Sequence, residues 1–267
     1  MEDLKELNRI CQKPDYKTRG NWMARHITRD MALPLSWIFL HTRITANQVT
    51  SISLFAGCAG CAFFGAGTKQ AMLFGAFLLQ LWYLLDHVDG HIARYRKQSN
   101  LTGVYFDYLT HYVVHAGIFT GIGYGVFRKT GNLFYLMTGV AAAMAIIFFN
   151  LCYDVLYKAY FSRIKTCGYL VVRRKTSAGQ GTDPARRGVS GRIFSFIHKT
   201  CEVHVLMNVV TVLAVFSFFW DLDVWRFCIT YYAFAAVFIS IMKNAHFVLF
   251  RVPDRTFEET FEADSES

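Results

Sequence analysis

The chain has 267 residues, of which 54% are hydrophobic and 16% aromatic, and its mean hydropathy of +0.26 is too high for an ordinary soluble domain. Only 4 prolines and long apolar runs favour helices over a β-barrel. The net charge of +9 would suit nucleic-acid binding, but the basic residues gather between apolar segments, where topology and anionic lipids explain them. We therefore expect an all-α polytopic membrane protein.

Residues 1–45 are expected to form a cytoplasmic arm that ends in a juxtamembrane amphipathic helix. Met1–Lys17 is polar and charged, unlike a signal peptide. Beyond it, apolar and charged side chains alternate at helical spacing, a pattern typical of a helix lying in the headgroup plane. The apolar set is Trp22, Met23, Ile27, Met31 and Leu35, and the charged set is Arg19, Arg25, Arg29 and Asp30. Pro34 predicts a break or kink in this helix.

Six apolar segments of membrane-spanning length follow, so residues 46–250 are predicted to form one transmembrane domain of six helices. The predicted spans are Asn47–Ala66, Ala71–Tyr95, Gly103–Phe127, Asn132–Phe161, Val203–Trp220 and Val224–Phe250. A basic cytoplasmic loop is expected at residues 163–202, with a mobile part at Thr176–Gly191. Residues 251–267 are expected to be an acidic cytoplasmic tail, disordered from Glu258 onward.

Basic residues are distributed unevenly among the connections between these spans. They are abundant in the N-terminal arm, after the second span and in the 163–202 loop, whereas the opposite connections are short. The positive-inside rule therefore places both termini in the cytoplasm. The junction of the second and third spans lies on the same side.

Charged side chains occur inside the second and third spans, at these cytoplasmic ends. Residues 86–94 read DHVDGHIAR, and Asp107 and His111 follow in the next span. An ionisable residue in a span costs roughly 2.5–3.5 kcal/mol to insert, so such residues usually mark a functional site. Three neighbouring carboxylates are typical of a site for a hard divalent cation, which enzymes use in phosphate chemistry.

Helical spacing brings the polar and small residues of this segment together. One face of the second span carries Asp86, Asp89, Gly90 and Ala93. Asp107 and His111 are one turn apart on the antiparallel third span, so we expect the acids to meet, with Arg94 available for a phosphate. A buried salt bridge is the competing interpretation, but three acids against one arginine leave negative charge that a divalent ion would neutralise.

The motif resembles the signature of the CDP-alcohol phosphotransferases, also called CDP-alcohol phosphatidyltransferases, which is D-x-x-D-G-x-x-A-R, eight residues, then G-x-x-x-D-x-x-x-D. The matching positions are Asp86, Asp89, Gly90, Ala93, Arg94, Gly103 and Asp107. The segment Ile44–Thr50 resembles the family's entry to its first span, with Ala46 where proline is common. The resemblance covers most of the chain, although the identical motif positions lie within residues 86–111.

The resemblance implies roles for these positions and a set of ligands. It implies that Asp86, Asp89, Asp107 and His111 are metal ligands. The metal would be Mg²⁺ or Mn²⁺, bound as two divalent ions. As nucleotide-binding residues it implies Asn47, Asp86, Asp89, Gly90, Ala93, Arg94 and Gly103. Weaker candidates for acceptor binding are Arg25, Arg29 and His115; the two arginines suit a lipid headgroup at least as well, and the histidine could simply pack.

One position departs from the family pattern, because His111 stands where the last aspartate is expected. The resemblance assigns that aspartate as general base. An imidazole with an unperturbed pKa of about 6.5 is a competent base at cellular pH, so His111 is the expected catalytic residue. Two alternatives stay open: His111 as a metal ligand, and an inactive protein.

The resemblance implies a prokaryotic inner- or cell-membrane enzyme of phospholipid biosynthesis that releases CMP from a CDP-linked donor. In one arrangement CDP-diacylglycerol gives its phosphatidyl group to a small alcohol. In the other, a CDP-activated head group is given to diacylglycerol or another lipid or glycan acceptor. A homodimer is expected, and no nucleic-acid partner. A metal-binding transporter and a silent lipid-binding homologue are the rivals from other classes.

Overall fold

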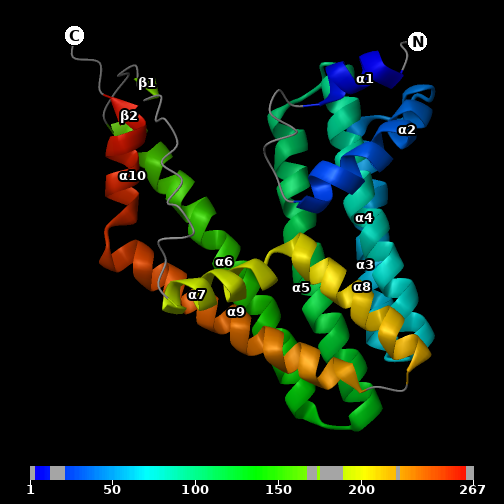
Figure 1. The fold of residues 1–267 in the computed structure, drawn as a ribbon. Helices are drawn as coiled ribbons and strands as arrows, with labels where there is room; N and C mark the ends of the chain where they lie inside the picture. Colours follow the sequence, from blue (N-terminus) through cyan, green and yellow to red (C-terminus); the bar gives the residue numbers. More distant parts are fainter. Residues whose placement is uncertain (1–3, 13–21, 167–172, 175–188, 221–222, 263–267) are drawn as a thin grey trace.

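The computed structural model describes residues 4–12, 22–166, 173–174, 189–220 and 223–262, which are almost entirely helical (Figure 1). The helices are α1 (Leu4–Cys11), the π-helical turn η1 (Ala24–Thr28), α2 (Arg29–Leu40), α3 (Ala46–Ala66), α4 (Lys69–Tyr95), α5 (Leu101–Thr130), α6 (Leu133–Thr166), α7 (Val189–Thr200), α8 (Val203–Phe219), α9 (Val224–Leu249) and α10 (Val252–Thr260). The two-residue strands β1 (Arg173–Arg174) and β2 (Phe261–Glu262) pair antiparallel.

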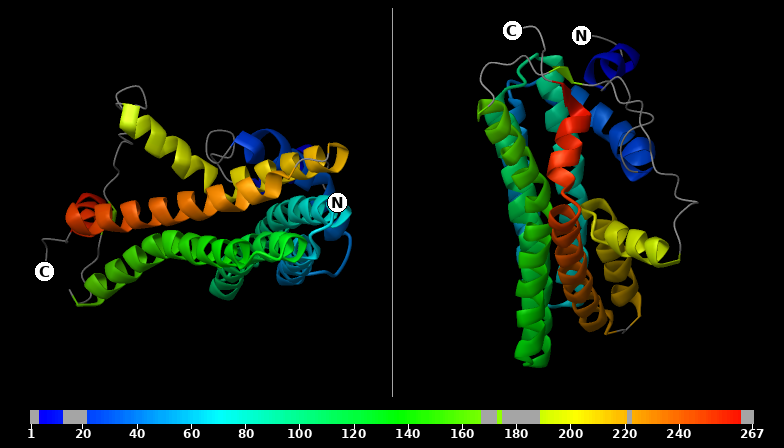
Figure 2. Two further views of the ribbon diagram at one scale, coloured as in Figure 1. Left: turned by 90° about the horizontal axis from the view of Figure 1, so that it is seen from below. Right: turned by 90° about the vertical axis from the view of Figure 1, so that its left-hand side faces the viewer.

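The long helices form one bundle in which the site-bearing helices are central. α3 packs against α4 and α5, α5 against α6, and α6 against α9, while α2 and α8 cover α4. The first and last helices, α1 and α10, lie at the same end of the bundle, as Figures 1 and 2 show. At this end α4 finishes and α5 begins, so the motif residues lie there as well.

Local capping explains why the chain turns back between α3, α4 and α5. Thr45 and Gln48 form a reciprocal capping box at the start of α3. Gly67 ends that helix in the left-handed region, at φ 73°, and the Thr68 hydroxyl caps α4. Asn100 caps α5 by accepting a hydrogen bond from the Gly103 amide at 2.8 Å. These short turns keep the three helices antiparallel and adjacent.

Glycines allow α3 to approach both neighbours closely. A Cβ atom added at Gly125 of α5 would lie 2.1 Å from the carbonyl oxygen of Phe64, and one added at Gly60 would lie 2.9 Å from the carbonyl of Gly75. Contacts of this kind are typical of membrane helices, where small residues let backbones meet. They fix the distance between the helices that carry the site.

The predicted all-α membrane fold is confirmed, and each predicted span corresponds to one helix. By length and hydropathy, however, four helices could each cross a membrane: α3, α4, α6 and α9. A fifth crossing is possible if α7 and α8, bent by 71° at their junction, count as one span. α5 falls outside this set because its polar site residues and many small residues lower its hydropathy.

The segments outside the spans contain more helix than expected. The predicted interfacial helix is present as η1 and α2, but α2 continues through Pro34 without a break. The tail expected from residue 251 begins with α10, whose Thr256 hydroxyl bonds to Tyr160 of α6. α6 itself continues to Thr166, into the predicted basic loop. Most of the predicted mobile part, Thr176–Gly191, lies outside the described residues.

Candidate active site

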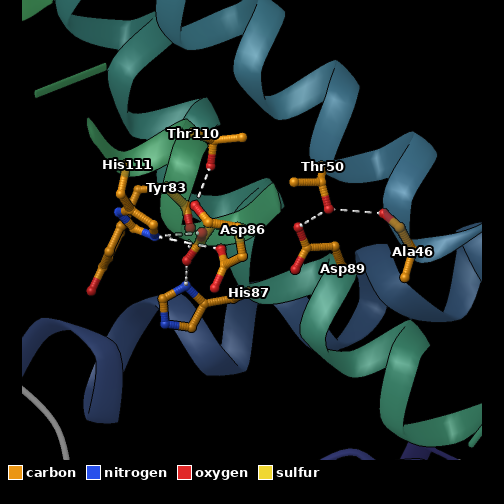
Figure 3. Close-up of polar contacts among 9 residues, drawn as sticks. Ala46, Thr50, Tyr83, Asp86, His87, Asp89, Thr110 and His111 are labelled. Carbon is orange, nitrogen blue, oxygen red and sulfur yellow. Dashed lines mark hydrogen bonds and ion pairs between the residues drawn. The ribbon is translucent and has the colours of Figure 1, made fainter. Parts of the chain in front are cut away.

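Two carboxylates and one imidazole meet where α4 ends and α5 begins. His111 Nε2 lies 3.0 Å from Asp86 Oδ1 and 3.6 Å from Asp107 Oδ1. One ligand atom from each of these three residues falls within 4.8 Å of the others. His87 Nδ1 lies between the carbonyl of Tyr83 at 2.9 Å and Asp86 Oδ2 at 3.8 Å. Figure 3 shows His111 and His87 on two sides of Asp86.

Asp89, one turn along α4, faces a different helix. Its Oδ2 atom accepts a hydrogen bond of 2.6 Å from the Thr50 hydroxyl of α3, and that hydroxyl also lies 3.1 Å from the carbonyl oxygen of Ala46 (Figure 3). The Asp89 residue is only 8% exposed. The predicted set of four ligands is therefore divided: Asp86, Asp107 and His111 cluster, while Asp89 is held apart by α3.

A cavity of about 210 Å³ lies beside the cluster. Its lining residues are Gln12, Arg29, Asp86, His87, Asp89, Gly90, His91, Arg94 and Asp107. Five predicted motif residues thus share one cavity, and Arg29 joins them from α2. His87 and His91, which were not among the predicted site residues, also line it, because α1 and α2 close the cavity on that side of α4.

Arg94 is held over the small residue Gly90. The Arg94 Nε donates to the Cys11 carbonyl at the end of α1, and a Cβ at Gly90 would lie 3.2 Å from Arg94 Nη1. Glycine therefore makes room for the guanidinium beside the cavity. On the side of α4 that faces α2, His91 Nδ1 contacts the Ser36 hydroxyl at 2.9 Å, which ties that helix to the site.

The remaining predicted residues do not line this cavity. Asn47 is beside Gly103, since a Cβ on that glycine would lie 3.3 Å from Asn47 Oδ1. Ala93 follows Asp89 by one turn on α4. His115 Nδ1 lies 3.4 Å from Asn150 Nδ2 of α6, one turn below His111. Arg25 is half-buried in η1, and its Nε has no hydrogen-bond partner among the described residues.

The sequence profile of the CDP-alcohol phosphatidyltransferases matches residues 43–178, which contain the whole motif. The chain belongs to the CDP-alcohol phosphatidyltransferase family. The resemblance noted in the sequence is therefore confirmed, and the chain is a membrane protein of this family that spans less than a third of the length of the curated relative it matches. α1 and α2, with Gln12 and Arg29 of the cavity, precede the part of the chain that matches.

Two known proteins are similar to this CDP-alcohol phosphatidyltransferase. A bifunctional IPC transferase and DIPP synthase from Thermococcus kodakarensis is 22% identical over 129 residues, which are 48% of this chain and 29% of that protein. The crystal structure of Mycobacterium tuberculosis phosphatidylinositol phosphate synthase with CDP-DAG bound has the same fold, with a TM-score of 0.52 and 17% identity. That match covers 81% of this chain and 91% of the other.

Four contributors to the site were not predicted: Gln12 and Thr50, and His87 and His91 as cavity residues. Thr50 had a usable signal, because it belongs to the Ile44–Thr50 segment that resembles the family's first span. Gln12 had none, since nothing in a short polar helix indicates which spanning helix it will pack against.

Proposed function

We propose that the chain transfers a phosphatidyl or phospho-head group from a CDP-linked donor to a hydroxyl acceptor and releases CMP, in phospholipid biosynthesis. The observation that carries the proposal is the cluster of Asp86, Asp107 and His111 beside a cavity lined by Gly90 and Arg94. Acids alone would suit many cation sites. Acids beside a glycine and a guanidinium suit a cation that accompanies a phosphate.

The donor set fits a divalent cation. Two carboxylates and an imidazole lie within reach of one point, and oxygen-rich sites of this kind suit Mg²⁺ or Mn²⁺. Asp86 and Asp107 would hold one ion, and Asp89 would supply a carboxylate for a second. His111 would be a ligand of the first ion only in the alternative in which it is not the base, because the single lone pair of Nε2 cannot bind a metal and accept a proton at the same time. A bound divalent ion would neutralise charge on the diphosphate and improve CMP as a leaving group.

The protein's own groups would carry out the rest of the reaction. His111 Nε2 would accept the proton of the acceptor hydroxyl as its oxygen forms a bond to the distal phosphorus of the donor. The bond from that phosphorus to the bridging oxygen breaks, and the electron pair leaves with CMP. Arg94 would bind a phosphate oxygen, and Gly90, Ala93 and Gly103 would let the nucleotide approach the helices, beside Asn47.

Between the two substrate arrangements we favour CDP-diacylglycerol as donor and a small polar alcohol as acceptor. The structural neighbour from Mycobacterium tuberculosis was crystallised with CDP-DAG bound, which supports a lipid donor. A CDP-activated head group given to diacylglycerol or to another lipid or glycan acceptor is the alternative. Arg25, Arg29 and His115 remain our candidates for contacts with the acceptor.

The test uses purified protein with Mn²⁺ or Mg²⁺ and radiolabelled CDP-diacylglycerol or CDP-head-group donors, and measures CMP release. Metal-dependent release that is lost in Asp86→Asn would support the proposal. A matched control is Asp254→Asn on the exposed helix α10, which is outside the bundle core. If no donor releases CMP, or if Asp86→Asn and Asp254→Asn have the same activity, the result would favour a transporter or a silent lipid-binding homologue instead.

We also propose an arrangement in the membrane. Residues 46–250 would form the catalytic domain, with the 1–45 arm, the 163–202 loop and the 251–267 tail in the cytoplasm, in a prokaryotic inner or cell membrane. The uneven distribution of basic residues supports this orientation. A homodimer packed through its spans would be detected by the mass of the protein in detergent.

A further inference from the structure

The imidazole of His111 is packed between two other rings. Trp82 of α4 meets it edge-on, with ring centroids 5.2 Å apart and planes at 70°. His115 meets it from the next turn of α5 at 5.7 Å and 73°, and Trp82 and His115 are themselves 6.1 Å apart. Each ring therefore contacts the other two in the edge-to-face geometry that aromatic pairs prefer.

Neighbouring helices make room for this ring cluster, which consists of Trp82, His111 and His115. Trp82 is 0% exposed, and it fits against α3 because Gly57 has no Cβ; one added there would lie 3.2 Å from the indole Cδ1. Asn150 of α6 lies 3.4 Å from His115 Nδ1. Helices α3 to α6 thus all contribute to the surroundings of His111.

The rings of Trp82 and His115 each carry a buried nitrogen atom, although a purely apolar side chain could fill the same space. Trp82 Nε1 and His115 Nε2 are buried, and in the part of the chain that the structure describes neither has a hydrogen-bond partner. An unsatisfied buried donor or acceptor costs about 1–3 kcal/mol, which a leucine or phenylalanine would avoid. Polar rings retained at such a cost beside a site indicate a functional constraint.

The constraint follows from the exchange of aspartate for histidine. A carboxylate presents an equivalent oxygen after a half-turn of its end group, whereas an imidazole presents a different atom, and its terminal torsion is broadly two-fold. An aspartate at position 111 would therefore not need neighbouring residues to fix the orientation of its end group. A histidine must have its ring turned so that Nε2, rather than a carbon, faces Asp86 and Asp107.

We propose that Trp82 and His115 are positioning residues that keep His111 Nε2 directed at Asp86 and Asp107, and that this chain needs them because position 111 is a histidine. The proposal rests on the proposed function, in which His111 acts as the base. It assigns no contact with substrate to either ring. Its consequence is that the two residues matter only when His111 is present.

A double-mutant cycle in CMP release tests this dependence. Trp82→Leu should lower kcat by about 10- to 100-fold, the loss expected when a catalytic group is misplaced, with the donor KM changed less than 3-fold. Trp82→Phe, which keeps an aromatic edge but loses the buried Nε1, should recover only part of the rate. In the His111→Asp background, Trp82→Leu should change kcat less than 3-fold. An equal loss in both backgrounds would overturn the proposal.

The matched control is Trp225→Leu, which removes another buried tryptophan, whose Nε1 donates to Ser217 on α8. It should reduce thermal stability as Trp82→Leu does, but it should not lower kcat selectively while the donor KM stays nearly unchanged. If the two variants lower kcat alike, the effect of Trp82 is one of stability alone, and the positioning role fails.

A second measurement does not depend on catalysis and separates failure of this proposal from failure of the proposed function. In protein labelled with ¹⁵N-histidine, the His111 ring signals are those lost in His111→Asp. We expect one set of signals in the wild type and shifted or doubled signals in Trp82→Leu and His115→Leu. Unchanged His111 signals in both variants would overturn the proposal, even in a preparation that releases no CMP.

Discussion

Asp86 and Asp89 are one helical turn apart, yet their surroundings differ. Asp86 faces His111 of α5 at 3.0 Å, whereas Asp89 accepts a hydrogen bond of 2.6 Å from Thr50 of α3. A hydrogen bond to a charged group is worth about 1.5–3 kcal/mol, so Thr50 restricts the rotamer of Asp89. The two acids are therefore held by different helices, and the geometry of the site depends on both.

Replacing Thr50 with valine should impair the site without unfolding the protein. Valine keeps the shape of threonine but removes the hydroxyl, so Asp89 would lose its partner. We expect kcat/KM for CMP release to fall about 10- to 100-fold, which corresponds to the energy of one such hydrogen bond. Steady-state kinetics in detergent, with a thermal melt to confirm folding, measure the effect.

The control for this variant is Thr120→Val on α5. Thr120 bonds to the carbonyl of its own helix at Ala116, as Thr50 does at Ala46, but it contacts no acid in the described structure. Activity of Thr120→Val should stay within about 2-fold of wild type. Equal losses in the two variants would mean that the Thr50–Asp89 bond has no role in the reaction.

The acidic limb of the pH–rate profile should depend on the residue at position 111. If His111 is the base, activity falls on acidification because the imidazole gains a proton and can no longer accept one. A carboxylate keeps its negative charge to lower pH, so in His111→Asp the acidic limb should move to lower pH. A limb that stays in place in this variant would exclude His111 as the titrating base.

Motif spacing was sufficient to predict the Asp86–Asp107–His111 cluster, because a short connection forces α4 and α5 together. It could not predict that Asp89 bonds to Thr50, since that depends on how far α3 is shifted along α4. His87 and His91 were not predicted as cavity residues for a related reason: the helical-face argument considered α5 and left out α1 and α2.

At the scale of elements, the helices that carry the site are held by backbone contacts that a side chain would prevent. Gly125 of α5 should tolerate no larger residue, because a Cβ there would lie 2.1 Å from the Phe64 carbonyl, and a backbone atom cannot turn aside. Gly125→Ala should destabilise the fold by about 1–3 kcal/mol or more, measured as a lower melting temperature in detergent.

Gly65→Ala provides the comparison for this variant. The Cβ it introduces would meet a ring carbon of Tyr124 at 3.3 Å, which a side chain can accommodate by a small shift. Its melting temperature should remain close to that of the wild type. If Gly65→Ala is as destabilising as Gly125→Ala, loss of glycine rather than close helix packing would be responsible.

The long helices could be predicted and the short ones could not. Apolar runs of about 20 residues predict spans directly, which is why α3, α4, α6 and α9 were found within a few residues of their observed ends. α1 and α10 have eight and nine residues, too few to be stable alone, and they depend on tertiary contacts. The contact between Tyr160 and Thr256 joins residues 96 positions apart, and local pattern does not reveal such a pair.

At the scale of the whole molecule, the path of α5 decides the topology. Its hydropathy does not identify it as a span, yet the proposed six-span arrangement requires it to cross. Single cysteines at the exposed positions 98 and 132, just before and after α5, should react with a membrane-impermeant maleimide from opposite sides, Gln98→Cys from the cytoplasm. Additional labelling over wild type, in intact cells and in inverted vesicles, measures the side. Labelling of both from one side would contradict a crossing.

The length of α6 has a practical consequence. Its 34 residues extend about 51 Å, whereas the hydrocarbon core is about 30 Å thick, so a helix along the membrane normal would extend about 20 Å beyond that core. Tyr160 on this projection meets the rings of Phe257 and Phe261 edge-to-face, with centroids 5.5 and 5.9 Å away, which braces it with α10 and β2. An antibody fragment bound to this projecting end of α6 would move rigidly with the bundle. The complex would then be large enough for particle alignment by electron cryomicroscopy, although the protein alone is only 30.6 kDa.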